Sequence, residues 1–321
     1  MSADGSPEDS VGGHRPPLQR VILGSRGSEL ARRQTGMVAE ALKRAWPELE
    51  TTVKIITTQG DEHRAQPLDS RAGRKGLFTG EIERALSAGE IDLAVHSAKD
   101  LPSEPTPGLE VAGVLGRAAV DDVLISKQPG KVLRPEAVVA TGSVRRQHQL
   151  RYKQPGIEVV DLRGNVPTRL RKLVTGRWDG IVLARAGVER LGHDLARGSF
   201  EFEGTLLHAQ VLSPDDFLPA GGQGVIALQV RCDDGNAGVI VRAINHGETF
   251  LCLEAEREFL RLLQGDCGSP VGVLATISGS AMTVRAQVFE PPRIEPRLAR
   301  VEGEASSAKQ LARKLWEAIN G

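Results

Sequence analysis

Residues 137–191 read AVVATGSVRRQHQLRYKQPGIEVVDLRGNVPTRLRKLVTGRWDGIVLARAGVERL, and in this stretch a strand, a polar loop and a helix follow one another three times. Short apolar runs at 137–140, 158–162 and 180–184 predict strands, and the amphipathic segments after them predict helices. Repeated alternation of this kind favours parallel sheets with helices on both faces. The stretch therefore indicates an α/β fold.

The same alternation continues on both sides of this stretch. Towards the N-terminus we expect strands at 21–23, 52–58, 91–97, 111–115 and 123–125, with helices ending at Trp46 and covering 77–88. Towards the C-terminus we expect an irregular segment at 193–216, then a strand at 225–230, helical structure at 238–263, strands at 271–278 and 282–289, and a helix at 307–319.

These elements predict three domains after a disordered tail at residues 1–19. Domain 1 is expected to comprise 20–116 and 217–236, domain 2 to comprise 117–216, and a small α/β domain 3 to comprise 237–321. A polar, glycine-rich segment at 59–75 is long for a connection between two elements, which predicts a mobile loop.

Composition excludes several classes of protein. Basic and acidic side chains balance at 41 each, so no overall field attracts nucleic acid or a membrane surface. Aromatic platforms for single-stranded nucleic acid are scarce, with 7 Phe, 3 Trp and 1 Tyr. No apolar run approaches the roughly 18 residues of a membrane span, and the tail lacks the apolar core of a signal peptide. The three cysteines suggest neither a disulfide framework nor a metal site, so we expect a cytoplasmic protein.

Charge is distributed unevenly within this neutral total. Residues 141–197 contain 12 Lys and Arg against 5 Asp and Glu, a net charge of +7. Several of these cations follow predicted strands, where the sheets of α/β proteins bind ligands and where helix N-termini favour anions. A single arginine is usually a solvated surface side chain, but several at strand ends indicate a site for a small polyanion.

Three other residues stand out beside these cations. Asp100 follows Lys99 and a buried strand, and its carboxylate either caps the turn before Pro102 or stabilises a developing cation. His96 lies inside that apolar strand and is expected to be a core histidine. Cys267 stands in a glycine-flanked loop, which makes it a candidate nucleophile or attachment point.

Eight segments form an ordered series of motifs. They are 24–28 (GSRGS), 74–78 (RKGLF), 94–102 (AVHSAKDLP), 141–147 (TGSVRRQ), 162–170 (LRGNVPTRL), 186–192 (AGVERLG), 218–224 (LPAGGQG) and 265–272 (GDCGSPVG). In this order they resemble the porphobilinogen deaminase family of tetrapyrrole synthesis, over roughly residues 20–320. The resemblance implies three domains, the first two similar to periplasmic binding proteins with mainly parallel sheets, and an active site in the cleft between them.

The resemblance also implies an activity, a transferase that condenses four porphobilinogen molecules with loss of ammonia and releases hydroxymethylbilane. The condensation starts from a dipyrromethane cofactor, which the resemblance attaches to Cys267 by a thioether. The implied enzyme is a monomer without a metal.

By matched motif, the resemblance gives roles to individual residues. It implies a catalytic role for Arg26, Lys99 and Asp100. The residues implied around the cofactor are Ser28, Lys99, Asp100, Ser143, Arg145, Arg146, Arg163 and Gly164. The residues implied to bind substrate are Arg26, Arg163, Arg169, Arg190 and Gln223, with Lys75 and Phe78 at the mouth of the cleft.

Two other functions are compatible with parts of the sequence. The same two-domain cleft serves binding proteins for organic anions, but the Cys267 motif argues against that function. An arginine-rich nucleic-acid binder is disfavoured by the neutral total charge and the few aromatic residues.

Overall fold

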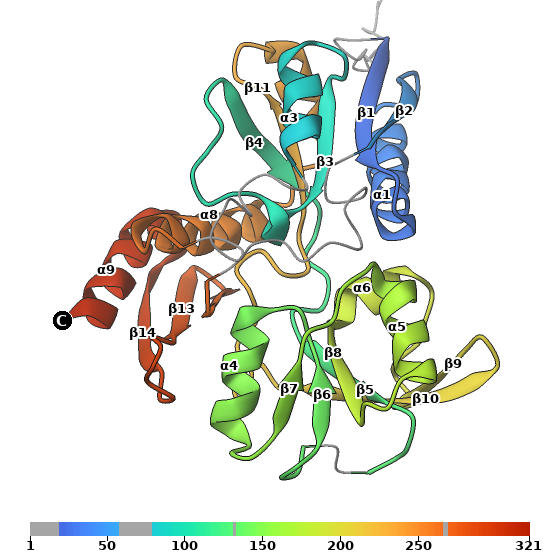
Figure 1. The fold of residues 1–321 in the computed structure, drawn as a ribbon. Coiled ribbons are helices and arrows are strands. Elements are labelled where there is room, and N and C mark those ends of the chain that lie inside the picture. The colour runs from blue at the N-terminus through green and yellow to red at the C-terminus, as the bar shows by residue number, and fades with distance from the viewer. Residues whose placement is uncertain (1–18, 58–78, 131–132, 266–268) are drawn as a thin grey trace, which may run out of the picture.

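The computed structural model describes residues 19–57, 79–130, 133–265 and 269–321. Over these residues the chain forms three β-sheets with helices packed on them (Figure 1). We call each sheet with its helices the first, second and third unit, in chain order of their first strands. This arrangement confirms the predicted α/β class with a small C-terminal α/β unit.

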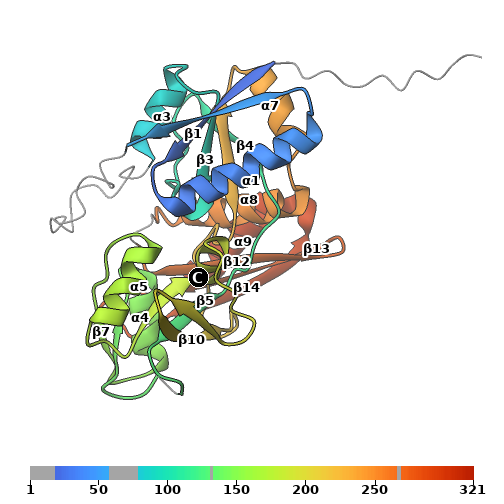
Figure 2. The same ribbon diagram turned by 90° about the vertical axis from the view of Figure 1, so that its right-hand side faces the viewer.

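The first unit has a mixed sheet. Its strand order is β2 (Glu50–Ile56), β1 (Arg20–Arg26), β3 (Leu93–Ser97), β11 (Ile226–Arg231) and β4 (Leu109–Val114). β11 runs antiparallel to both of its neighbours, whereas the other strands run in one direction. Helices α1 (Glu29–Ala45) and α7 (Gly235–Arg242) cover one face, and α3 (Gly80–Ser87) covers the other. Figure 2 shows α1 lying across the sheet.

The second unit is built in the same way. Its strand order is β7 (Glu158–Val160), β6 (Val138–Ala140), β8 (Gly180–Ala184), β5 (Asp122–Ser126), β10 (Thr205–Leu212) and β9 (Ser199–Phe202). Helix α4 (Val144–Lys153) packs on one face through Leu150. Helices α5 (Val166–Thr175) and α6 (Arg185–Arg190) pack on the other through Leu170, Leu173 and Val188. The predicted strand and helix series of residues 137–191 is confirmed.

The expectation of an irregular segment at 193–216 was wrong. Most of this segment forms the hairpin β9–β10, whose strands pair from Phe202 with Thr205 back to Ser199 with His208. The connecting residues Glu203 and Gly204 have φ values of 48° and 78°, the left-handed conformation that two-residue hairpin turns require. Phe200 and Phe202 point into the core while Glu201 between them is exposed.

The third unit is a three-stranded antiparallel sheet of β12 (Val271–Ser278), β13 (Ala281–Val288) and β14 (Arg297–Glu304). Helices α8 (Gly247–Leu262) and α9 (Ala308–Asn320) pack on it through Phe259, Leu311 and Leu315. The sequence predicted β12, β13 and α9 but not β14. The predicted boundary at residue 237 falls inside α7, whose Ile240 and Val241 pack with the first sheet, so residues 237–242 belong to the first unit.

Two segments connect the first and second units, residues 115–121 and 213–225. Glu256 on α8 is fully buried and joins both connections to the third unit. Its carboxylate accepts hydrogen bonds from Arg117 Nη1 at 2.7 Å, from the Gly222 amide at 2.7 Å and from the Ala275 amide at 2.8 Å. One side chain therefore links all three units at the point where the chain crosses.

Candidate active site

Strand ends of the first unit bring three predicted site residues together. Arg26 ends β1, Ser28 caps the N-terminus of α1, and Asp100 ends a short 3-10 turn, η1 (Ala98–Asp100), after β3. All three line one cavity of about 70 Å³. The Ser28 hydroxyl accepts a hydrogen bond from the Ala31 amide at 3.3 Å, which fixes the start of α1. The structure therefore brings these three residues together, while the roles expected for them stay predictions.

His96 also lines this cavity, but it is a core residue, as expected. Its side chain is buried, and its Nε2 lies 3.0 Å from Gln229 Oε1. Burial lowers the pKa of His96 to about 4, so the ring is neutral at physiological pH.

In the second unit, the two adjacent arginines of α4 are buried around one carboxylate. Arg145 Nη1 lies 2.8 Å from Asp122 Oδ2, and Arg146 Nη2 lies 2.7 Å from Asp122 Oδ1. Arg145 also donates to the Leu218 carbonyl at 2.7 Å, and Arg146 to the Val182 carbonyl at 2.9 Å. Only 3% of Arg145 and 5% of Arg146 is exposed. Much of their hydrogen-bonding capacity is therefore used inside the protein, which the sequence did not indicate.

Gln223 is fully buried in the second connection between the units. Its amide donates to the Val120 carbonyl at 2.7 Å and to Asp122 Oδ1 at 2.9 Å. Gln223 thus ties one connecting segment to the other, and its expected role in binding substrate stays a prediction.

Lys99 lies within electrostatic range of this buried cluster. Burial, together with the nearby Arg146, lowers the pKa of Lys99 to about 8, while Asp100 and Asp122 oppose the shift. Two arginines share one carboxylate, so the cluster presents an excess positive charge to Lys99. The interaction places the first unit's Lys99 opposite the second unit's arginines.

Arg169 on α5 faces the same gap. Burial, together with Arg146 and Arg163, lowers the pKa of Arg169 to about 10, while Asp100 opposes the shift. Its Nε donates to the Gly164 carbonyl at 2.7 Å, which orients the guanidinium. Asp100 of the first unit therefore lies within electrostatic range of a cation of the second unit.

The other predicted residues of the second unit lie at helix ends. Arg163 is about half exposed and pairs with Asp161 at 2.8 Å. Ser143 is the N-cap of α4. Arg190 ends α6 and donates from Nη2 to the Gly224 carbonyl at 2.7 Å, and burial lowers its pKa to about 10. Lys75, Phe78 and Cys267 lie outside the described residues, so the expectations for them remain predictions.

Asp122 is the important site residue that the sequence analysis missed. It opens β5 in the run VDDVLIS, where an acidic residue begins an apolar strand. A carboxylate at the start of an apolar strand is buried only when it has a partner. The sequence therefore contained a sign that a cation lies inside the protein near Asp122. Its partners Arg145 and Arg146 are more than twenty residues further along the chain, so no local sequence pattern indicated the pairing.

The arrangement gathers cations from two units around the carboxylate of Asp100, which forms no ion pair within 4.0 Å with any residue that the structure describes. Such a site can bind a molecule with several carboxylates and stabilise positive charge next to Asp100. Within the described residues, no group of three or more histidine, cysteine or acidic side chains is placed to hold a metal ion. A membrane-spanning helix is likewise not found in the part of the chain that the structure describes.

Solved structures resemble the chain only slightly. A periplasmic VFT2 domain of Bordetella pertussis BvgS is 16% identical, with a TM-score of 0.43 over 70% of this chain and 86% of that chain. This likeness is too slight to support a conclusion about ligand or activity.

Sequence relatives are much more similar. A porphobilinogen deaminase of Roseiflexus sp. (strain RS-1) is 44% identical over 84% of this chain and 86% of that protein. A porphobilinogen deaminase of Syntrophomonas wolfei subsp. wolfei is 43% identical over 94% of this chain and 95% of that protein. Residues 21–238 match the porphobilinogen deaminase, dipyromethane cofactor binding domain, and residues 250–320 match the porphobilinogen deaminase, C-terminal domain. The chain therefore belongs to the porphobilinogen deaminase family.

Proposed function

We propose that this protein joins four porphobilinogen molecules head to tail, with loss of ammonia at each step, and releases linear hydroxymethylbilane by hydrolysis. The observation that carries this proposal is the placement of Asp100 among cations from two units, with Arg26 beside it and Arg169 in electrostatic range. Each porphobilinogen has two carboxylates. A growing chain therefore needs several fixed cations around few acidic groups.

The residues present fit a dipyrromethane cofactor, which also has carboxylate side chains. The Nε of Arg190 is buried and has no hydrogen-bond partner among the described residues, and the same is true of Thr79 Oγ1 at the wall of the small cavity. Buried donors of this kind favour a ligand that supplies acceptor oxygens. When bound, the cofactor supplies the pyrrole carbon to which the first porphobilinogen is joined.

The chain's own residues then bind the carboxylates and stabilise charge. Lys99 and Arg169 are partly desolvated cations, which bind carboxylates more strongly than solvated cations do. Exposed Arg163 meets carboxylates at the edge of the site. The Asp100 carboxylate stabilises the positive charge that develops as ammonia leaves. Buried Arg145 and Arg146 act through their electric field and hold their position through Asp122.

Intact-mass measurement tests the proposal. The purified enzyme is expected to exceed the mass of its amino acids by one dipyrromethane and to give a colour with an acidic aldehyde reagent. Cys267→Ser should lose both properties, while Cys232→Ser, at an exposed thiol, should keep them. If the native protein has only the mass of its amino acids, even after incubation with porphobilinogen, the proposal is wrong.

We also propose that the enzyme works as a monomer in the cytoplasm. Cys232 and Cys252 are free thiols, which suits a reducing compartment. Light scattering across a range of protein concentrations is expected to give the mass of one chain. A constant dimer mass would contradict this proposal.

A further inference from the structure

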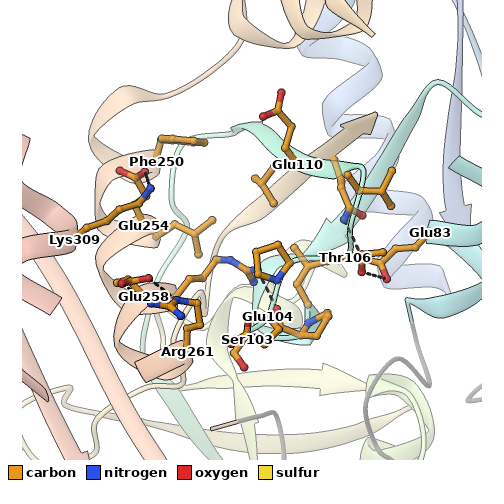
Figure 3. A pocket seen from close by; sticks show the side chains of 18 residues that line it. Glu83, Ser103, Glu104, Thr106, Glu110, Phe250, Glu254, Glu258, Arg261 and Lys309 are labelled. Atoms are coloured by element: carbon orange, nitrogen blue, oxygen red, sulfur yellow. Dashed lines mark hydrogen bonds and ion pairs between the residues drawn. The ribbon is translucent and has the colours of Figure 1, made fainter. Parts of the chain in front are cut away.

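A second cavity, of about 400 Å³, lies between the first unit and α8 (Figure 3). It shares no lining residue with the small cavity around Arg26 and Asp100. Its volume is within the range of about 300–1,000 Å³ in which proteins bind small organic molecules. The proposed condensation reaction gives this cavity no role.

The floor of the cavity is apolar and built from two units. Leu101 and Leu253 belong to one buried cluster, against which Val111 and Phe250 pack. Leu109 adds a further buried aliphatic surface. A ligand with a flat apolar body would remove this surface from water, which gives about 25 cal/mol per Å².

The two walls of the cavity differ in charge. On the α8 side two cations are paired, with Lys309 Nζ 3.2 Å from Glu254 and Arg261 Nε 2.8 Å from Glu258, and a third cation, Arg257, also lines this side. The first unit contributes the carboxylates Glu83, Glu104 and Glu110. None of these three has an ion pair within 4.0 Å among the described residues, although Arg261 is within longer electrostatic range of Glu104. Glu83 is buried and accepts hydrogen bonds from Thr106 Oγ1 at 3.0 Å and from Gln229 Nε2 at 2.9 Å, so Glu104 and Glu110 are the two open carboxylates. Figure 3 shows the α8 pairs on one side of the cavity and Glu83 with Thr106 on the other.

The cavity also touches the turn that carries Asp100. Pro102 lies two residues after Asp100, and its carbonyl accepts a hydrogen bond from Arg257 Nη2 on α8 at 2.9 Å. Both Pro102 and Arg257 line the cavity. Glu256, the residue directly before Arg257 on α8, holds the connections between the units. A molecule wedged between α8 and residues 101–106 would press on both contacts.

We propose that this cavity is an effector site for a small organic cation with an apolar body. The apolar floor binds the body, and the unpaired carboxylates at the wall of the first unit select a positive charge over a negative one. Occupancy displaces the Asp100 turn and slows the reaction. The binding of the cation does not depend on the proposed function, whereas the effect on rate rests on it.

The binding test uses the holoenzyme and a pair of probes with nearly the same body and opposite charge. We expect 2-phenylethylamine to bind one site per chain, about tenfold more tightly than 3-phenylpropionate, in calorimetric titrations at pH 7. Glu104→Gln/Glu110→Gln should weaken the amine about fivefold, because both side chains are exposed and each contributes modestly. Glu40→Gln/Glu48→Gln, an exposed pair elsewhere with the same change in net charge, should leave the affinity unchanged.

Location is tested separately by filling the cavity. Val111→Trp places an indole over the floor and should abolish binding of the amine, while circular dichroism checks that the variant folds. Equal affinity for the two probes, or equal behaviour of the two double variants, would overturn the selection of cations. Unchanged binding in Val111→Trp would overturn the site.

The effect on rate is measured as porphobilinogen consumption over a range of amine concentrations up to saturation. We expect a several-fold lower kcat in the native enzyme, and weaker inhibition in Glu104→Gln/Glu110→Gln at unchanged KM. Competition with porphobilinogen that both enzymes show equally would place the amine in the active site and overturn the effector role. An enzyme inactive without the amine would count against the proposed function and leave the binding result intact.

Discussion

Lys99 and Asp100 are adjacent in the chain, and together they bring a positive and a negative charge to the gap between the first two units. Their neighbours differ, since Arg145, Arg146 and Asp122 lie around Lys99 whereas Arg26 and Ser28 share a cavity with Asp100. We propose that this single turn supplies both a group for binding carboxylates and a group for stabilising a cation.

Replacing Asp100 tests the second of these roles. We expect Asp100→Asn to lower kcat by about 10²–10³ with a small change in KM, because it removes a charge that acts mainly in the transition state. Steady-state kinetics with porphobilinogen measures both constants, and Glu48→Gln at an exposed position is the control. Turnover close to that of the native enzyme would contradict the catalytic role.

The lowered pKa of Lys99 predicts a pH dependence. Because this pKa is about 8, the ammonium is charged below that pH and loses its proton above it. We expect kcat/KM to fall as the pH rises through about 8, since binding of carboxylates loses one cation. In Lys99→Arg the guanidinium stays charged, so the fall should move upward by more than about one pH unit. Rate profiles from about pH 6 to about pH 10 measure this, and coincident profiles would exclude Lys99 as the titrating group.

The lowered pKa of Asp122 leads to a prediction about the stability of the fold. Burial alone would raise the pKa of Asp122, but Arg145 and Arg146 outweigh it and hold this pKa well below the usual range. Its ionised form therefore stabilises the fold above the unfolded pKa of about 4, and this contribution is lost as the pH falls below that value. We expect Asp122→Asn to lower the free energy of unfolding by about 3–5 kcal/mol at neutral pH, because two buried guanidiniums lose their counter-ion.

Urea unfolding of Asp122→Asn at several pH values measures this change, and the difference from the native protein should shrink below about pH 4. The neighbouring Asp121→Asn is a matched control. Asp121 lies 3.5 Å from Arg185 at a partly exposed position, so its loss should cost no more than about 1 kcal/mol. Equal effects of the two variants would refute the special role of Asp122.

At the scale of elements, the sequence predicts those with a strong local pattern. Residues 180–184 are an apolar run between turn residues and form β8 with the same bounds. The hairpin β9–β10 was missed although SFEF alternates and Glu203-Gly204 suits a tight turn, because that turn needs a positive φ at Glu203. In β14, partly buried and exposed residues alternate, but polar side chains occupy both sets, so periodicity gave no signal.

The same limit applies to the site. Strand ends located Arg26, Asp100 and Arg169, because a residue after a parallel strand lies at the ligand-binding edge whatever its partners are. The burial of Arg145, Arg146 and Gln223 depends on Asp122, which is 23 to 101 residues away in the chain. Pairings over such distances are set by tertiary packing, and a single sequence does not reveal them.

Gly164 provides a test at the start of α5. Its φ of 119° is unfavourable for other residues, and a Cβ there would lie 2.7 Å from Thr168 Cγ2. We expect Gly164→Ala to lower the free energy of unfolding by about 1–3 kcal/mol and to raise KM, because the Gly164 carbonyl orients Arg169. Gly36→Ala is the control inside α1, where a Cβ has open space, and it should raise stability by about 0.5–1 kcal/mol. An unchanged KM in Gly164→Ala would separate this turn from substrate binding.

At the scale of the whole molecule, Glu256 holds three units together. We expect Glu256→Gln to lower the free energy of unfolding by about 3–5 kcal/mol, because Arg117 loses its counter-ion in a largely buried position. Scanning calorimetry should resolve two thermal transitions where the native enzyme shows one, since the third unit is then less firmly coupled to the others. Glu254→Gln on the same helix, at a partly exposed pair with Lys309, should keep one transition. A single transition in both variants would refute the coupling role.

The insertion of β11 between β3 and β4 has a consequence for synthesis of the chain on the ribosome. The second sheet has all its strands once residue 212 has emerged, whereas the first sheet lacks an internal strand until residue 231. The first unit, whose translation begins first, is therefore completed after the second unit. A nascent polypeptide halted between residues 212 and 231 would expose the facing edges of β3 and β4 to chaperones.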